Sequence, residues 1–246
     1  MGETLRQSEA TDLSVIVPTF READNLPLLV PRLTDALARA GLVGEILVVD
    51  DDSPDDTVAV CADLAGRYPV RLLVRKGERG LATAVLHGMR QARGRILVVM
   101  DADLSHPPEQ VPELYALVAN GQADFALGSR FVPAGSVAAD WGFYRRANAL
   151  IARLLARPLA RLHDPLSGFF ALPRSAFAAA VDLNPVGYKI GLELLVKTAP
   201  RRIREVPVHF ADRARGSSKM TWREQLNYLR HLAQLYGYRL RRLLGR

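Results

Sequence analysis

The first half of the chain alternates short apolar runs with segments of helical periodicity. The apolar runs are residues 13–18, 45–50, 70–75, 95–100 and 124–129. Between them, helical patterns are predicted over Asn25 to Ala40, Ser53 to about Gly66, and about Leu81 to Arg93. Because the runs lack polar alternation and are separated by helices, the pattern indicates an α/β fold. We expect a mostly parallel central sheet with helices on both faces.

The second half of the chain is less regular. Helices are predicted over about 144–162 and 191–199, a strand over 203–210, and a long amphipathic helix from Thr221 onward. No internal repeat or low-complexity linker divides the chain. We therefore predict a flexible N-terminus at 1–12, one domain at 13–220 and a C-terminal basic amphipathic helix at 221–246.

Acidic residues are crowded where two of the predicted strands end. Asp50, Asp51 and Asp52 close the second strand, and Asp101 and Asp103 follow the fourth. In open parallel sheets, ligands bind at this carboxyl edge. Two carboxylates one residue apart repel each other unless a cation lies near them, and hard oxygen ligands suit Mg²⁺ or Mn²⁺. The sequence therefore predicts a divalent metal site at Asp101 and Asp103.

A purely structural explanation covers part of the first acidic cluster. Ser53 can cap a following helix, Pro54 suits its first turn, and Asp55 and Asp56 favour the positive end of the helix dipole. This explanation leaves the three aspartates before Ser53 unaccounted for. A carboxylate at that strand end could accept hydrogen bonds from a ribose or a base edge.

Charge is distributed unevenly along the 246 residues, whose formal net charge is +7. Residues 1–128 hold 12 Lys and Arg against 19 Asp and Glu, whereas residues 129–246 hold 21 against 7. This asymmetry suits a site with a metal on one side and phosphate on the other. A basic nucleic-acid-binding or membrane-binding tail is the alternative. Nucleic acid is disfavoured because aromatic and basic residues do not interleave and no known binding module is recognisable.

The sequence also lacks features that define several classes. Neither G-x-G-x-x-G nor a P-loop follows a predicted strand, so bound phosphates would need a metal or cationic side chains. No run approaches the roughly 20 apolar residues of a spanning helix, and the first residues contain no signal peptide. A single cysteine, Cys61, excludes an internal disulfide and favours a reducing compartment. We expect a cytoplasmic protein, either free or bound to a membrane surface.

Two sets of motifs carry a resemblance to a known family. The first set resembles glycosyltransferase family 2, whose catalytic domain has the GT-A nucleotide-sugar-binding fold; it comprises PTFRE (18–22), DDDSPDDT (50–57) and DADLSHPPE (101–109). The second set is similar to the dolichyl- or polyprenyl-phosphate mannosyltransferases; it comprises GSRFV (128–132), DPLSGFFAL (164–172), GYKIGLELLVK (187–197), VPVHFADRARGSSKM (206–220) and REQLNYLRHL (223–232).

This resemblance implies that the domain at 13–220 is catalytic and moves mannose from GDP-mannose to a polyprenyl phosphate, with inversion at the anomeric carbon. A related transferase with another donor, such as UDP-glucose, remains an alternative. A non-catalytic nucleotide-binding subunit is a further alternative, against which the intact Asp101 and Asp103 argue.

The resemblance also implies roles for individual residues. The guanosine pocket would be lined by Pro18, Phe20, Glu22, Val49 and Asp51. The metal and the diphosphate would be held by Asp101, Ala102 and Asp103, with Ser105 nearby. The lipid phosphate would face Arg130 and Arg145, and the donor phosphates or sugar would be reached by Lys189, Arg213 and Lys219. His106, which precedes two prolines, is interpreted as shaping its loop rather than binding the metal.

The C-terminal helix is predicted to contact the membrane. Its apolar stripe is accompanied by six arginines from Arg223 onward, a combination typical of membrane-surface helices. An ordinary core helix is the alternative. Because a polyprenol stays in the bilayer, we expect peripheral attachment to the cytoplasmic face, with a partner membrane protein left open. Trp222 to about Leu232 would pack on the domain, and the interface would receive Tyr236, Tyr238, Leu240, Leu243 and Leu244.

Overall fold

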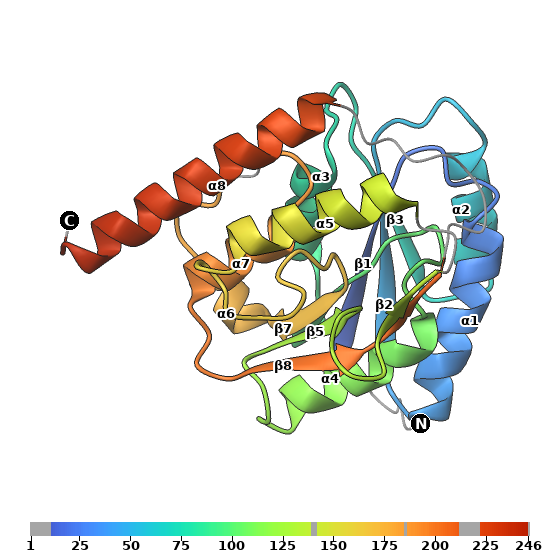
Figure 1. Ribbon diagram of the computed structural model, residues 1–246. Helices are drawn as coiled ribbons and strands as arrows, with labels where there is room; N and C mark the ends of the chain where they lie inside the picture. The colour runs from blue at the N-terminus through green and yellow to red at the C-terminus, as the bar shows by residue number, and fades with distance from the viewer. Residues whose placement is uncertain (1–10, 139–141, 185, 212–221, 246) are drawn as a thin grey trace.

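A seven-stranded sheet in the order β3-β2-β1-β4-β7-β5-β8 runs through the centre of the computed structural model (Figure 1). The structure describes residues 11–138, 142–184, 186–211 and 222–245, and of 143–145 and 222–224 it describes the backbone alone. The strands are β1 (Leu13–Thr19), β2 (Gly44–Asp50), β3 (Val70–Val74), β4 (Ile96–Val99), β5 (Phe125–Ser129), β7 (Phe170–Pro173) and β8 (Ile203–Pro207). All neighbouring strands pair in parallel except β7, which is antiparallel to both β4 and β5. The predicted mostly parallel sheet is confirmed.

Helices cover both faces of the sheet because side chains alternate along each strand. Val15 and Ile46 point into one core cluster, while their neighbours Ile16 and Leu47 point into the other. The first cluster is covered by α1 (Leu26–Arg39), α2 (Thr57–Ala65) and, after the short turn η1 (Pro108–Gln110), α4 (Val111–Ala119). The second is covered by α3 (Leu81–Gln91), α6 (Arg174–Ala178), α7 (Ile190–Thr198) and α8 (Trp222–Leu243).

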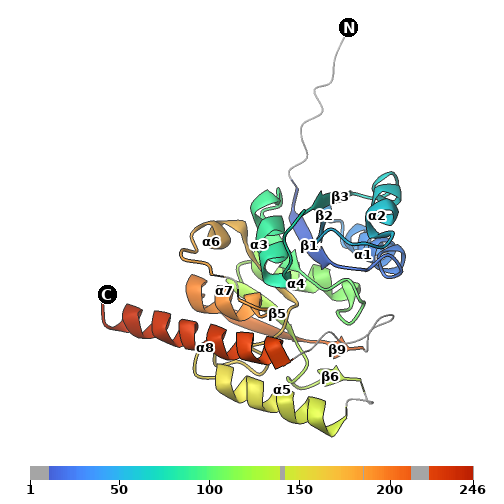
Figure 2. The same ribbon diagram turned by 90° about the horizontal axis from the view of Figure 1, so that it is seen from above.

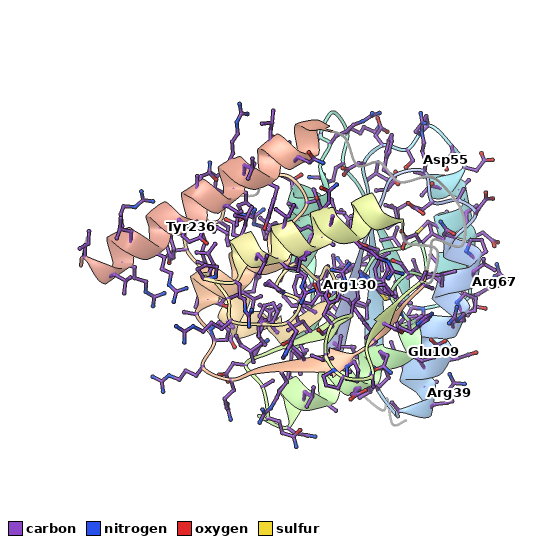
Figure 3. All side chains as sticks on the ribbon, in the orientation of Figure 1. Arg39, Asp55, Arg67, Glu109, Arg130 and Tyr236 are labelled. Atoms are coloured by element: carbon purple, nitrogen blue, oxygen red, sulfur yellow. The ribbon has the colours of Figure 1, made fainter. Side chains whose placement is uncertain are left out.

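The C-terminal helix α8 lies beside α5 (Phe143–Ala156), as both ribbon views show (Figures 1 and 2). The hydroxyl of Tyr228 donates to the carbonyl of Ala152 at 2.6 Å, and that of Tyr236, labelled in Figure 3, donates to the carbonyl of Leu155 at 2.7 Å. Leu235 is buried and Tyr238 packs against the core, so contact with the domain extends beyond the predicted limit near Leu232. No helix among the described residues is both long enough and apolar enough to cross a membrane.

Two predicted helix boundaries are wrong. Helix α2 begins at Thr57 rather than at Ser53, because the amide and hydroxyl of Ser53 both donate to Asp50 and hold Ser53 in the strand exit. Ser53 is therefore not a helix cap. Helix α5 ends at Ala156 rather than near residue 162, because Pro158 has no N–H with which to continue the helical ladder.

The sheet contains one strand that the sequence analysis did not predict. β7 lies between β4 and β5 and separates two parallel parts of the sheet. The segment predicted as one strand at 203–210 divides at Pro207, and its end forms β9 (His209–Phe210), which pairs with β6 (Ser136–Val137). Helices α4 and α6 were also not predicted.

The N-terminal segment predicted to be flexible, 1–12, falls outside the described residues up to position 10. Asp12 itself is held in place. Its amide donates to the carbonyl of Val43 at 2.8 Å, and its carboxylate accepts from Arg95 at 3.0 Å.

Candidate active site

The candidate site lies where β1, β2, β4 and β5 end at one edge of the sheet. Because these strands share a direction, their last residues, Thr19, Asp50, Val99 and Ser129, bring their exit loops together. The polar motifs at 50–57 and 101–109 belong to these loops. This is the position at which open α/β sheets bind ligands.

The first aspartate after β2 has a structural role. Asp50 is fully buried, and its carboxylate accepts from the Thr19 hydroxyl at 2.9 Å and from the amide and hydroxyl of Ser53 at 2.8 and 2.7 Å. These bonds fasten the exits of β1 and β2 together. They compensate the cost of burying a carboxylate in a crowded acidic segment.

Asp51, predicted to line the guanosine pocket, is also held by protein groups. Arg75 Nε donates to Asp51 Oδ1 at 2.8 Å, and the amide of Gly80 donates to Oδ2 at 2.8 Å. Asp51 and Arg75 are both buried. Sequence reasoning missed Arg75, whose only signal was a basic residue at the end of a predicted strand. The pair joins the end of β2 to the loop before α3.

Three other residues predicted for the guanosine pocket lie around the exit of β1. Pro18, Phe20 and Glu22 are half-buried there, and the amide of Glu22 donates to the hydroxyl of Thr57 at 3.0 Å. The guanidinium of Arg79 lies over the Phe20 ring, 4.4 Å from its centroid. Val49 is different, because its side chain is fully buried in the core. Only its backbone could contact a nucleotide.

The loop after β4 holds Asp101 and Asp103 in different environments. Asp103 is buried, and its Oδ1 accepts from the amide and hydroxyl of Ser105 at 3.1 and 2.6 Å. Ser105 thus orients Asp103. Leu104 between them has a φ of 62°, a strained backbone conformation of the kind that concentrates at functional sites. Ala102 is buried beneath the loop.

His106 positions the loop from below, as interpreted from the sequence. Its Nδ1 accepts a hydrogen bond from the amide of Asp101 at 3.0 Å, and its ring stacks on Phe169 at 5.2 Å. Burial lowers the pKa of His106, although the nearby carboxylates Asp101 and Asp103 oppose this shift. The ring is therefore neutral at pH 7 and acts as a support for Asp101.

The carboxylate of Asp101 is open to the site. Its side chain is 35% exposed, and a Cβ added at Gly168 would lie 3.9 Å from each of its oxygens. Gly168 therefore keeps the space beside Asp101 clear. Within the described residues, no three His, Cys, Asp or Glu side chains are grouped to hold a metal by themselves. One or two carboxylates completed by substrate phosphates are the usual Mg²⁺ ligands, and the residues present fit that arrangement.

Cationic groups lie opposite the acidic loop. Lys189 donates to the carbonyl of Leu166 at 3.2 Å and lies over the ring of Tyr188. Burial and the charge of Arg130 lower the pKa of Lys189 to about 8, against the opposing influence of Asp164 and Asp101. A bound phosphate would favour the protonated amine.

Arg130, predicted to face the lipid phosphate, forms an ion pair with Asp164, a residue that the sequence analysis did not single out. Its Nε and Nη2 donate to the two carboxylate oxygens of Asp164 at 2.7 and 2.8 Å. Asp164 is fully buried, and Arg130 lies below α5 in the view of Figure 3. The guanidinium also lies about 5 Å from the rings of Phe131 and Phe210. Arg130 therefore has a structural role, because it neutralises the buried Asp164 and contacts two aromatic rings.

The side chains of the remaining predicted cations lie outside what the structure describes, so their roles stay predictions. Arg145 lies in the first turns of α5, where the backbone alone is described. Arg213 and Lys219 lie outside the described residues.

The lowered pKa of Lys189 predicts a pH-dependent affinity for phosphorylated donor. If Lys189 binds the phosphates of a nucleotide-sugar donor, the affinity for that donor should be greatest at pH values well below 8, where the amine is protonated. It should fall by up to about tenfold per pH unit above that value. Calorimetry between pH 6.5 and 9.5 would measure this slope. Lys189→Met should bind more weakly at pH 7 and show no such slope, whereas a wild-type affinity that is constant up to pH 9.5 would contradict the prediction.

Comparison with known proteins places these features in context. The family model described as Glycosyl transferase family 2 matches residues 14–179. Three curated relatives are each named Dolichol-phosphate mannosyltransferase. The one from Pyrococcus furiosus is 45% identical over 227 residues, covering 91% of this chain and 63% of the relative. Those from Mycosarcoma maydis and Saccharomyces cerevisiae are 44% and 40% identical, covering 94% and 93% of this chain and 81% and 88% of the relatives. The chain therefore spans less than two thirds of the archaeal relative's length.

Solved structures share the fold at lower identity. Mannosyl-3-phosphoglycerate synthase from Rubrobacter xylanophilus superposes with a TM-score of 0.65 and 21% identity over 96% of this chain and 76% of that one. Glucosyl-3-phosphoglycerate synthase from Mycobacterium tuberculosis, in complex with Mg²⁺ and UDP, superposes with a TM-score of 0.63 and 20% identity over 92% of this chain and 78% of that one. The same synthase is also solved with Mn²⁺ and UDP. These likenesses confirm the GT-A fold.

Proposed function

Since this chain belongs to glycosyltransferase family 2, we propose that it transfers mannose from GDP-mannose to the phosphate of a polyprenol. The product would be a polyprenyl phosphate mannose, formed with inversion at the anomeric carbon. The names of the three curated relatives support mannosyl transfer to a dolichyl-type phosphate. The observation that carries the proposal is the open Asp101 carboxylate at the end of β4, opposite Lys189 and Arg130.

A divalent ion, Mg²⁺ or Mn²⁺, would be held by Asp101 and Asp103 together with the donor diphosphate. When bound, such an ion stabilises the negative charge that develops on the leaving nucleotide. The chain's own residues prepare this site. His106 fixes the backbone of Asp101, Ser105 fixes the carboxylate of Asp103, and Gly168 leaves room beside them. Solved structures of the same fold with Mn²⁺ and Mg²⁺ support the choice of metal.

The acceptor explains why the site needs cations rather than a general base. A phosphate monoester has its second pKa near 6, so at pH 7 it is mostly a dianion and already a nucleophile. Its approach to the donor diphosphate is opposed by like charge. Lys189 and Arg130 would offset this repulsion and orient the attacking oxygen. Arg145, Arg213 and Lys219 remain proposed contributors on the basis of family likeness.

Helices α5 and α8 support a membrane-bound acceptor. α5 exposes Leu150, Ile151, Leu154 and Leu155, the neighbouring α8 exposes Leu226, Leu229, Leu240 and Leu243, and Leu244 just after α8 is also exposed. Apolar area on this scale indicates a lipid or protein contact. A groove of about 660 Å³ on α5 and the following loop combines leucines with Arg153, Arg157 and Arg161. Such a lining suits an isoprenoid chain beside anionic headgroups, so we propose peripheral attachment to the cytoplasmic face of the membrane.

Replacing Leu240, Leu243 and Leu244 with serine should abolish flotation with anionic liposomes while GDP-mannose binding is retained. Burying one leucine stabilises an apolar contact by roughly 1.5–3 kcal/mol, so the three together dominate attachment. High salt should also weaken binding of the wild type to anionic liposomes. Each arginine near an anionic surface contributes about 1 kcal/mol, and salt screens this attraction.

The matched control is Leu28→Ser with Val43→Ser, which removes exposed apolar side chains elsewhere on the domain. This control should float like the wild type. If the triple serine variant also floats normally, the end of α8 does not attach the enzyme to lipid.

One assay tests the reaction itself. Labelled GDP-mannose and labelled UDP-glucose are each offered with a polyprenyl phosphate and Mg²⁺, and label is counted in the lipid fraction. We expect transfer from GDP-mannose. Transfer from UDP-glucose instead would assign the alternative donor. No transfer from either, with retained GDP binding, would point to a non-catalytic subunit.

A further inference from the structure

A second cavity, of about 1070 Å³, lies between α6, α7 and α8. It is lined by the segment Ala179–Asn184, by α7 residues around Glu193 and Lys197, and by α8 residues from His231 to Arg242. None of the residues discussed in the nucleotide and metal site lines it. Its volume lies near the upper end of the range found for small-molecule binding sites.

The inner wall of this cavity contains buried polar atoms without partners. Glu193 and His231 are each 1% exposed. Glu193 Oε1 accepts from Lys197 Nζ and from the amide of Asn184, both at 2.6 Å. Among the residues that the structure describes, Glu193 Oε2 and both ring nitrogens of His231 have no hydrogen-bond partner. His231 Nε2 approaches Glu193 Oε2 to 3.4 Å without hydrogen-bond geometry.

Such atoms are costly to leave unsatisfied, which indicates that something polar belongs beside them. A buried donor or acceptor without a partner destabilises the fold by about 1–3 kcal/mol. Burial raises the pKa of Glu193, but the close approach of His231 and the hydrogen bonds from Lys197 and Asn184 outweigh it and keep the pKa below its ordinary value. Glu193 is therefore an anion that accepts hydrogen bonds.

The chemistry of this inner wall selects a hydroxyl group. A hydroxyl can donate to Glu193 Oε2 and at the same time accept from a ring N–H of His231. A cationic ligand is disfavoured, because Lys197 already neutralises Glu193 and two further cations line the cavity. An anionic group of the ligand is disfavoured at the inner wall, because the negatively charged carboxylate of Glu193 would repel it.

The outer part of the cavity is cationic. Arg241 and Arg242 line it from the last turns of α8, and both are exposed. Gly237, one turn before Arg241, is part of the same lining. Tyr238 adds an aromatic ring to the same lining. Two guanidinium groups at the mouth of a cavity suit a phosphate group.

We propose that this cavity binds a hydroxylated phosphate monoester, of the class of a sugar phosphate. A ligand hydroxyl bridges Glu193 and His231, and the phosphate lies between Arg241 and Arg242. Because the ligand contacts α7 and α8 together, it fixes the C-terminal helix on the domain. The site is independent of the transferase reaction proposed above.

The test is calorimetric titration of the full chain with mannose 6-phosphate, with the active site saturated by GDP and Mg²⁺. We expect one site whose affinity falls at least tenfold in His231→Leu and in the double variant Arg241→Ala with Arg242→Ala. The charge-matched control, Arg201→Ala with Arg230→Ala, lies outside the cavity lining and should bind like the wild type. Mannose and inorganic phosphate should each bind at least tenfold more weakly than mannose 6-phosphate.

Absence of binding at millimolar concentrations, or equal affinity for inorganic phosphate alone, would overturn the proposal. So would unchanged affinity in the Arg241 and Arg242 variant, which is at the surface and should fold even if His231→Leu does not. Circular dichroism checks the fold of each variant. Vesicles containing phosphatidylinositol phosphate distinguish the source of the ligand. If His231→Leu binds these vesicles more weakly than the wild type, the ligand is a lipid headgroup. If the two proteins bind the vesicles equally, the ligand is a soluble ester.

Discussion

Replacing Asp101 with asparagine is expected to reduce mannosyl transfer by roughly a hundredfold or more while the fold remains intact. The substitution keeps the size of the side chain and removes the charge that would hold a divalent ion. Asp101 is held through its backbone, whose amide donates to His106, so the loop should keep its conformation. Its carboxylate is partly exposed, so the substitution should not disturb the packing of the core.

The measurement is transfer of label from GDP-mannose to polyprenyl phosphate, with thermal unfolding followed in parallel. Asp63→Asn on the surface of α2 is the matched control, since it removes one exposed carboxylate that belongs to neither acidic motif. The control should retain wild-type transfer. Near-normal activity of Asp101→Asn, or full activity of the wild type in EDTA, would show that the metal assignment is wrong.

Replacing Arg130 with alanine is expected to destabilise the protein by about 3–5 kcal/mol, which is the usual effect of leaving a buried charge without its partner. Asp164 is fully buried and takes two hydrogen bonds from the Arg130 side chain. If Arg130 only contacted the lipid phosphate, its replacement would leave the stability of the ligand-free protein unchanged. Urea unfolding at pH 7 distinguishes the two roles.

At acid pH, the difference in the free energy of unfolding between the wild type and Arg130→Ala should become smaller. Burial raises the pKa of Asp164, but hydrogen bonding and charge from Arg130 reverse this and leave its pKa below the ordinary value. In the wild type, the resulting stability is complete above the unfolded-state pKa near 4 and is lost as pH falls through the lower folded-state value. Without Arg130, the carboxyl group of Asp164 can be buried in its neutral form. The variant should therefore lose less stability than the wild type as the pH is lowered.

A double variant separates the structural role of Arg130 from its proposed role in transfer. Arg130→Ala combined with Asp164→Asn removes both charges and should recover much of the lost stability. Its transfer to lipid phosphate should stay low if Arg130 also orients the acceptor. Recovery of both stability and transfer would reduce Arg130 to a structural residue. A single Arg130→Ala variant as stable as the wild type would contradict the ion pair itself.

Much of the fold follows from local pattern. The apolar run 45–50 is short and rich in β-branched residues, which favours a buried strand, and the leucines of α1 repeat at helical spacing. Neighbours in the sequence therefore carry enough information to locate these elements. The same holds for Asp101 and Asp103, which are one residue apart and therefore reach the same edge of the sheet together. The motifs around them carried the family likeness that the comparisons confirm.

The sequence by itself thus determined the parallel sheet, its carboxyl edge and the acidic loop, because each depends on residues close together in the chain. The tertiary structure decided which charges neutralise one another. Asp51 is paired with Arg75, 24 positions away, and Arg130 with Asp164, 34 positions away. It also decided that β7 enters the sheet antiparallel and that Lys189 lies near Arg130. These outcomes depend on burial and distance in three dimensions, which local periodicity does not encode.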